Sequence, residues 1–283
     1  MEIAVLSDIH GNYMALQKCL EHAKSRNITT YFFLGDYLGE FPYPQKTMEI
    51  LYAMREKYEC FFIRGNKEDY WINRRAETNC DWKYGNHGVK AMISCYENLT
   101  AKDIDFFETL PVCQNVQLPG TAPVLLCHGN PVNNRGTLLP ADENTQELLK
   151  KYPQQYIVCG HTHIQGMFTE SGKTILNAGS VGVPLRQNRQ TQYMILSSEN
   201  QECNYRFVSL DYDVDTVIKE LHESGLWEIA PYWCRVTKHL LYTGEISHGT
   251  ALLEAMKANG YKDKWYNVGE QYWEEAFQVL GIE

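Results

Sequence analysis

Five short apolar runs in this chain each end in aspartate, asparagine or histidine, with a glycine beside the polar residue. The runs and the residues that follow them are EIAVLSDIHG (2–11), TTYFFLGD (29–36), YECFFIRGN (58–66), APVLLCHG (122–129) and QQYIVCGHTH (154–163). Short apolar runs bounded by turn residues are typical of buried strands, and the carboxyl ends of parallel strands meet at one edge of a sheet. The pattern therefore favours folds in which several strand ends share one site.

The segments between these runs indicate the fold class. Residues 12–24 and 43–57 carry apolar side chains at helical spacing, so the first three runs predict βαβ units with parallel strands. A helical middle follows at 86–110. The later runs, up to residue 212, stand close together, which predicts antiparallel pairing. We expect an α/β fold, a four-layer α/β/β/α sandwich of two packed sheets.

The composition changes near residue 213, where a helical appendage is expected to begin. Four of the six tryptophans follow this point, and Val214, Val217, Ile218 and Leu221 stand at helical spacing. We divide the chain into a main domain, 1–212, and an appendage, 213–283. The aromatic residues of the appendage either pack it onto the core or form a lid or a dimer contact, which would make the protein a homo-oligomer.

The net charge and the cysteine content indicate which partners and which cellular location to expect. The net charge of −9 argues against a broad nucleic-acid surface, since phosphate backbones require lysine and arginine. We find no apolar run of the roughly 18–20 residues that a membrane helix needs, and the first residues predict no secretory signal. Nine scattered cysteines without a C-x-x-C pair fit reduced thiols. We expect a cytoplasmic protein that does not enter membranes.

The polar residues at the strand ends are of the types that bind transition metals. They are Asp8, His10, Asp36, Asn66, His128, His161 and His163. Oxygen and imidazole ligands without thiolates suit Mn, Fe, Zn or Ni. Seven ligands exceed the need of one tetrahedral ion, whereas two ions that share a bridging carboxylate would use them all. Such ion pairs stabilise the attacking and leaving oxygens of phosphoryl transfer.

The G-H-T-H segment raises the question of how two histidines two residues apart reach one site. In an extended stretch, residues i and i+2 point to the same side, so we expect His161 and His163 to share the site in this way. Taken alone, the segment also fits a polar turn with two exposed histidines. Likewise, Asp8 alone fits a helix cap and Asp36 a turn. The recurrence at five strand ends favours a common site.

The order D-x-H, G-D, G-N, H-G and G-H-T-H, followed by NAGSVGVP (177–184), resembles the calcineurin-like metallophosphoesterase superfamily, and most closely its small bacterial and archaeal phosphodiesterase-like branch. The resemblance spans about residues 1–210. It implies a dinuclear metal site with Mn²⁺ as the favoured ion and a metal-bound hydroxide as the nucleophile. By this resemblance Asp8, His10 and His163 hold one metal, Asn66, His128 and His161 hold the other, and Asp36 bridges them.

One position departs from the family pattern. Many members read G-N-H-E or G-N-H-D, and their histidine stabilises the transition state or protonates the leaving oxygen; here the segment is GNKED, with Lys67. An ammonium, with an ordinary pKa near 10.4, stabilises phosphate charge but gives up a proton reluctantly. Lys67 and His128 are the residues we expect to act in catalysis. We therefore expect diesters or anhydrides to be better substrates than alkyl monoesters.

The substrate is expected to be a small phosphorylated molecule such as a nucleotide. Two groups of side chains near the motifs are candidates for binding it: Tyr37, Phe41, Tyr43, Arg186 and Arg189. The aromatic residues would stack on a ring and the arginines would bind distal phosphates; otherwise the aromatic residues pack inward and the arginines are solvated.

These features favour hydrolysis of a phosphodiester or nucleoside-polyphosphate bond. Two other functions stay open: a protein serine/threonine or small-molecule phosphomonoesterase, and a non-catalytic scaffold with the same fold. The segment YLGEF after Asp36 lacks the Asp-Arg-Gly of the protein phosphatases. A scaffold has no need for seven residues of metal-binding type.

Overall fold

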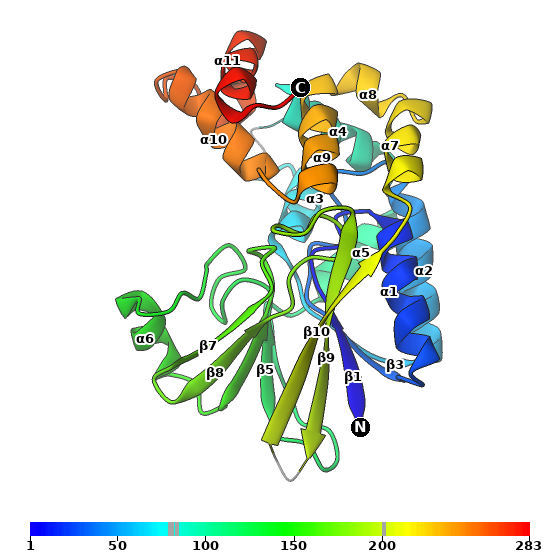
Figure 1. Ribbon diagram of the computed structural model, residues 1–283, viewed down its shortest axis with the longest axis vertical. Coiled ribbons are helices and arrows are strands. Elements are labelled where there is room, and N and C mark those ends of the chain that lie inside the picture. Colours follow the sequence, from blue (N-terminus) through cyan, green and yellow to red (C-terminus); the bar gives the residue numbers. More distant parts are fainter. Residues whose placement is uncertain (79–81, 83–84, 200–201) are drawn as a thin grey trace.

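Two five-stranded sheets packed face to face form the centre of the protein, and helices cover their outer sides (Figure 1). The computed structural model describes residues 1–78, 82, 85–199 and 202–283. This architecture confirms the predicted four-layer α/β/β/α sandwich with a helical C-terminal region.

The first sheet contains the parallel strands expected from the beginning of the chain. Its order is β10 (Glu202–Asp211), β9 (Gln190–Glu199), β1 (Glu2–Leu6), β2 (Thr30–Phe33) and β3 (Glu59–Phe62). Strands β1, β2 and β3 are parallel, while β9 and β10 form an antiparallel hairpin at the other edge. Helices α1 (Tyr13–Ser25) and α2 (Pro44–Lys57) connect the parallel strands, as the apolar spacing predicts.

The second sheet corrects one prediction. Its order is β4 (Cys113–Val116), β5 (Val124–Cys127), β6 (Tyr156–Cys159), β8 (Lys173–Asn177) and β7 (Gly166–Glu170). Strands β5, β6 and β8 are parallel, so uniform antiparallel pairing was wrong. Helix α6 (Glu143–Leu149) lies in the β5–β6 connection, and the unpredicted strand β7 lies between β6 and β8 in the chain. In this sheet β4 and β7 pair antiparallel with their neighbours.

Apolar layers hold the sheets in place, and one of them joins Leu125 and Ile157 of the second sheet to Leu149 of α6. Between the sheets, Val5 and Phe32 from the first belong to one cluster with Leu126 and Val158 from the second. On the outer face of the first sheet, a second cluster includes residues of α1 and α2, of α4 (His87–Glu97) and of α5 (Ala101–Thr109). Burial on both faces explains why these strands read as continuous apolar runs.

The C-terminal helices form a further apolar cluster above the carboxyl ends of the strands (Figure 1). They are α7 (Val214–Glu223), α8 (Leu226–Ile229), α9 (Pro231–Thr243), α10 (His248–Ala258), the 3₁₀ helix η1 (Trp265–Asn267) and α11 (Glu270–Leu280). This cluster also includes Phe41, Ala91 and Val183 of the main domain. Aromatic residues of these helices, Trp233 and Trp273 among them, therefore pack in one cluster with residues from before position 213. Within the described residues, no helix has the length and apolarity to cross a bilayer.

A single buried carboxylate ties together the loops that follow β2 and β3. Glu68, in the first turn of α3 (Asn66–Arg75), is fully buried. Its two oxygens accept hydrogen bonds from the backbone N–H groups of Gly65 (2.7 Å), Asp36 (2.9 Å) and Tyr37 (2.9 Å). Burial and the neighbouring charge of Asp36 raise the pKa of Glu68 to about 7. Glu68 thus fixes the spacing between two strand ends of the first sheet.

The segment after β8 packs directly against the segment after β1. The N–H of Val181 donates to Ser7 O (2.9 Å) and that of Gly182 donates to Asp8 O (3.0 Å). A Cβ atom on Gly182 would lie 1.9 Å from the carbonyl oxygen of Ile9, closer than any real contact. The approach of these two backbones therefore requires glycine at 182.

Gly182→Ala should destabilise the protein by about 1–3 kcal/mol, the usual cost of overpacking a buried site. Urea unfolding followed by circular dichroism measures this change. Gly166→Ala is the matched control, because no atom lies within 4 Å of the position where its Cβ would be. Equal stability of the two variants would contradict the close packing described above.

Glu68→Gln should lower the free energy of unfolding by about 1–3 kcal/mol, because an amide NH₂ would then face backbone N–H donors. The exposed Glu49, on α2, provides the control Glu49→Gln. Thermal and urea unfolding of both variants would test the prediction, and equal stability of Glu68→Gln and the Glu49→Gln control would refute it.

Candidate metal centre

The seven side chains expected to bind metal lie together where strands of the two sheets end. Asp8 and His10 follow β1, Asp36 follows β2 and Asn66 follows β3. From the second sheet, His128 follows β5, and His161 and His163 follow β6. The structure therefore brings all seven to one place, at the carboxyl ends of parallel strands, as the sequence predicts.

Five of these seven residues have left-handed backbone conformations. Their φ angles are 55° at Asp8, 56° at His10, 52° at Asp36, 67° at His161 and 59° at His163. Positive φ is uncommon outside glycine, and such strain concentrates at functional sites. The two histidines of the G-H-T-H segment reach the site from a tight turn of the backbone, so the extended geometry expected for this segment was wrong.

One group of ligand atoms surrounds the first oxygen of Asp8. Asp8 Oδ1 lies 3.1 Å from His163 Nε2 and 3.7 Å from His10 Nε2, and the two histidine nitrogens are 3.1 Å apart. The other oxygen of Asp8 accepts hydrogen bonds from Ser7 Oγ (2.5 Å) and from the N–H of His161 (2.9 Å). Asp8 Oδ1 is buried and accepts no hydrogen bond from any described residue.

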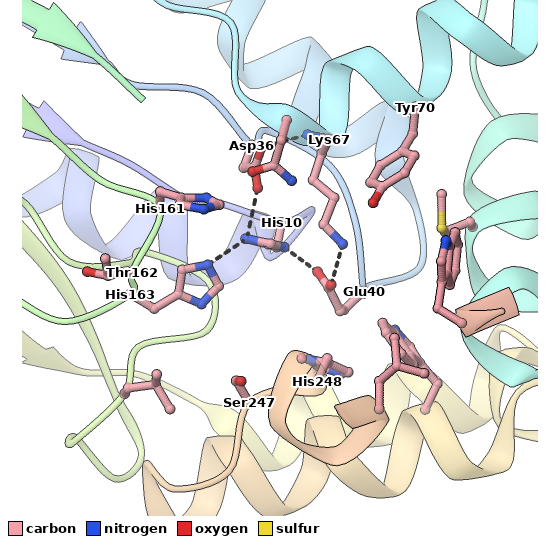
Figure 2. A pocket seen from close by; sticks show the side chains of 17 residues that line it. His10, Asp36, Glu40, Lys67, Tyr70, His161, Thr162, His163, Ser247 and His248 are labelled. Carbon is pink, nitrogen blue, oxygen red and sulfur yellow. Dashed lines mark hydrogen bonds and ion pairs between the residues drawn. The ribbon is translucent and has the colours of Figure 1, made fainter. Parts of the chain in front are cut away.

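A second group surrounds His128. His128 Nε2 lies 3.2 Å from Asn66 Oδ1 and 3.2 Å from His161 Nδ1. Asp36 lies between the groups, with Oδ1 3.5 Å from His128 Nε2 and Oδ2 3.7 Å from His10 Nε2. The two oxygens of Asp36 therefore face different histidines, of which Figure 2 shows His10.

Hydrogen bonds on the far side of two rings direct their other nitrogens into the site. His128 Nδ1 lies 2.7 Å from the carbonyl oxygen of Leu34, which can only accept, so Nδ1 carries a proton. In the neutral ring, Nε2 then has a free lone pair, and it faces an oxygen of Asn66. His10 Nδ1 likewise contacts the carboxylate of Glu40. Histidines that bind metals almost always have such an outer partner.

These observations indicate that the residues fit divalent cations. Nitrogen and oxygen atoms of the types that bind metals lie about 3 Å from one another, and a buried carboxylate oxygen has no hydrogen-bond partner among the described residues. Burial would lower the pKa of His10, but the charge of Glu40 and hydrogen bonds to Asp8 and Glu40 raise it to about 10. The local carboxylates thus favour positive charge at this place.

A cavity of about 360 Å³ opens onto this cluster. Lys67 lines it and donates a hydrogen bond from Nζ to Glu40 Oε1 at 2.7 Å, so Glu40 connects Lys67 to His10 (Figure 2). Burial would lower the pKa of Lys67, but the charges of Glu40 and Asp36 raise it. Lys67 therefore faces the cavity as a cation.

Sequence reasoning did not identify three residues of this site. Glu40 stands in the segment YLGEF beside the aromatic candidates, and Glu68 directly follows Lys67. His248, which belongs to none of the five motifs, lines the cavity from the beginning of α10. Glu40 and Glu68 could have been found as acids beside two ligand motifs. No local pattern marks His248, which packing brings to the site.

The aromatic candidates for substrate binding lie in apolar clusters instead. Tyr37 is fully buried, and its hydroxyl donates to the carbonyl oxygens of Ile63 (2.6 Å) and Phe33 (3.1 Å). Phe41 is buried in the cluster of the C-terminal helices. Their inward packing places both away from the described wall of the cavity, so the expectation that they stack on a substrate was wrong.

The remaining three candidates contact other parts of the protein. The ammonium nitrogen of Lys46 lies over the ring of Tyr43, 4.2 Å from the centre of that ring. Arg189 donates to Asp215 at 2.6 Å, and the N–H of exposed Arg186 donates to Gly244 O at 2.6 Å. These two arginine contacts join the loop before β9 to the C-terminal helices. None of these three side chains is among the described residues that line the cavity.

Comparisons with known proteins agree with this geometry. The sequence model of the calcineurin-like phosphoesterase superfamily domain matches residues 1–201. An uncharacterized protein of Methanocaldococcus jannaschii is 26% identical over 252 residues, which cover 82% of this chain and 94% of that protein.

Two crystal structures share the fold. A hypothetical protein from Pyrococcus horikoshii superposes with a TM-score of 0.71 and 20% identity, covering 87% of this chain and 99% of that one. A metallophosphoesterase from Sphaerobacter thermophilus gives 0.67 and 21%, with the same coverage. The chain belongs to the calcineurin-like phosphoesterase superfamily, and it is a metal-dependent phosphoric ester hydrolase.

Proposed function

We propose that the protein hydrolyses a phosphodiester or nucleoside-polyphosphate bond at a centre of two divalent cations, with Mn²⁺ favoured. The observation that carries the proposal is the position of Asp36, whose Oδ1 lies 3.5 Å from His128 Nε2 and whose Oδ2 lies 3.7 Å from His10 Nε2. One carboxylate between two sets of ligands is the arrangement that a pair of metal ions requires.

The ligands divide between the two ions as the family resemblance implies. Asp8, His10 and His163 would hold the first ion. Asn66, His128 and His161 would hold the second, and Asp36 would bridge. The first three form a compact group of ligand atoms, and Asp36 and His128 form another with Asp8, which belongs to both groups. Two such ions supply Lewis acidity and activate water at neutral pH.

The protein groups around the centre position the ester and stabilise its charge. Lys67, held by Glu40 at 2.7 Å, would stabilise negative charge on the phosphoryl oxygens. Because its pairing with Glu40 favours the charged form, it is a poor proton donor to a leaving group. Esters whose leaving groups depart without a proton should therefore react best.

The first test is metal content together with turnover of two aryl esters, p-nitrophenyl phosphate and bis(p-nitrophenyl) phosphate, with Mn²⁺ added. We expect two metal ions per chain and a larger kcat/KM for the diester. Strong preference for the monoester would instead favour the phosphomonoesterase function. Folded protein without metal and without turnover of either ester would refute the proposal.

Asp36→Asn should reduce the metal content below two per chain and lower kcat for the diester by at least about 100-fold, since even an outer partner of a metal ligand contributes 10–100-fold. Inductively coupled plasma mass spectrometry and steady-state kinetics measure both quantities. The exposed Asp105 offers the control Asp105→Asn. Full metal content in Asp36→Asn would contradict the bridging position.

Lys67→His should raise the ratio of monoester to diester turnover by about tenfold, because a positioned imidazole can protonate an alkoxide leaving group, a contribution of roughly 10²–10⁴-fold at best. Steady-state kinetics with an alkyl monoester and an alkyl diester give the ratio. The exposed Lys57, at the end of α2, provides the control Lys57→His. An unchanged ratio in Lys67→His would show that proton donation does not limit monoester turnover.

A further inference from the structure

The cavity has two walls of different chemistry. The wall at the strand ends carries the metal-binding residues with Glu40 and Lys67. The opposite wall is apolar and aromatic, and half of its six residues come from the C-terminal helices; the six are Tyr70, Met92, Leu185, Trp233, Leu252 and Trp265. Phosphoryl transfer at the metals has no need of this second wall. Its residues are available to bind the part of the substrate that does not react.

The charges around the cavity limit what that part can be. Among the described residues that line the cavity, Lys67 is the one lysine or arginine, and its ammonium is paired with Glu40. A chain of further phosphates would bring several negative charges and would require additional cations to bind them. The second wall offers aromatic rings instead, which bind flat uncharged groups by stacking.

His248 adds one polar atom to this apolar wall. Thr237 Oγ1 lies 3.0 Å from Trp233 O and 2.8 Å from His248 Nε2. When the hydroxyl donates its single proton to Trp233 O, the contact with His248 uses a proton on Nε2. Burial lowers the pKa of His248 to about 3, which keeps the ring neutral. Nδ1 is then an acceptor, and the structure gives it no partner among the described residues.

Ser247 and His248 stand where α10 begins, and Figure 2 shows them on the side of the cavity across from His10 and His161. An apolar cavity with a few placed polar groups is the usual form of a small-molecule site, and 360 Å³ lies at the small end of the range of roughly 300–1,000 Å³ for such sites. The volume suits one ring system joined to a phosphoryl group, and it is small for two nucleosides joined by phosphates.

We propose that the wall from the C-terminal helices is a subsite for the organic part of the ester: a single flat, uncharged aromatic group with a hydrogen-bond donor at its edge, which His248 Nδ1 accepts. This inference rests on the proposed function, because the phosphoryl group must lie at the metals for its substituent to reach the wall. It narrows the substrate to a diester of one aromatic alcohol or one mononucleotide.

Two phosphonates of equal charge test the subsite without turnover: phenylphosphonate and methylphosphonate, titrated into the full-length protein with Mn²⁺ by isothermal calorimetry. Phenylphosphonate should bind about tenfold more tightly, as expected for one stacked ring. In Trp265→Ala the ratio should fall to about twofold. The control is Trp227→Ala, because Trp227 stacks on His222 at 4.0 Å, away from the cavity.

A second pair of variants covers the case in which loss of Trp265 unfolds the protein. Leu252 lines the cavity, whereas its neighbour Leu253 is exposed to 57%. Leu252→Ala should reduce the phenyl-to-methyl ratio at least twofold, and Leu253→Ala should leave it unchanged. Equal affinity for the two phosphonates, no binding of either, or an unchanged ratio in folded Trp265→Ala or Leu252→Ala would overturn the subsite.

The acceptor is tested with the three hydroxyphenylphosphonates. At least one isomer should bind about fivefold more tightly than phenylphosphonate, in line with a hydrogen bond of about 1 kcal/mol. His248→Phe keeps a ring in place and leaves Thr237 its bond to Trp233, and the gain should then fall below twofold. No gain for any isomer, or a gain that persists in His248→Phe, would remove His248 from the proposal.

The outcomes separate the subsite from the proposed function. If the phosphonate ratio is as expected but neither aryl ester is hydrolysed, the reaction class is wrong while the subsite stands. If esters are hydrolysed and the two phosphonates bind equally, the reaction class stands and the subsite is wrong.

Discussion

The carboxylate of Glu68 is the contact on which the candidate metal centre depends. It accepts hydrogen bonds from three backbone N–H groups, on the loops that follow β2 and β3, at 2.7–2.9 Å. Asp36 lies on the first of these loops, and Asn66 and Lys67 begin α3 directly after the second. The N–H of Lys67 in turn donates to Asp36 Oδ1 at 2.7 Å. Because side chains at a metal centre need accurate placement, a rigid buried anchor beneath them is a physical requirement.

Strain is the second constraint on this site. Five of the seven expected ligands have positive φ, and each such residue costs of order 1–3 kcal/mol. The packing of the two sheets must offset this cost. The close backbone approach at Gly182 and the buried layer between β1, β2, β5 and β6 supply rigid contacts on both sides of the turns. These turns direct the side chains of the expected ligands from both sheets toward one point.

The sequence predicted the first half of the fold and the seven clustered residues well, because both depend on local patterns: apolar runs, helical spacing and a polar residue where each strand ends. The sequence did not predict the features that depend on tertiary packing. The direction of β8 depends on the unpredicted strand β7, which reverses the chain between β6 and β8. Tyr37 directly follows Asp36, one of the expected ligands, yet points into the core. His248 reaches the cavity from the far end of the chain, and no short motif reports such a contact.

The order of the site residues along the chain has a consequence for synthesis and for evolution. All seven expected ligands lie between residues 8 and 163, whereas Trp233, His248 and Trp265 of the opposite wall emerge from the ribosome later. In a nascent chain the expected metal-binding residues are therefore synthesised before these residues of the opposite cavity wall. For the same reason, mutations in the C-terminal helices can change the opposite wall and leave the seven expected ligands unchanged. Substrate selectivity and chemical reactivity can therefore evolve independently.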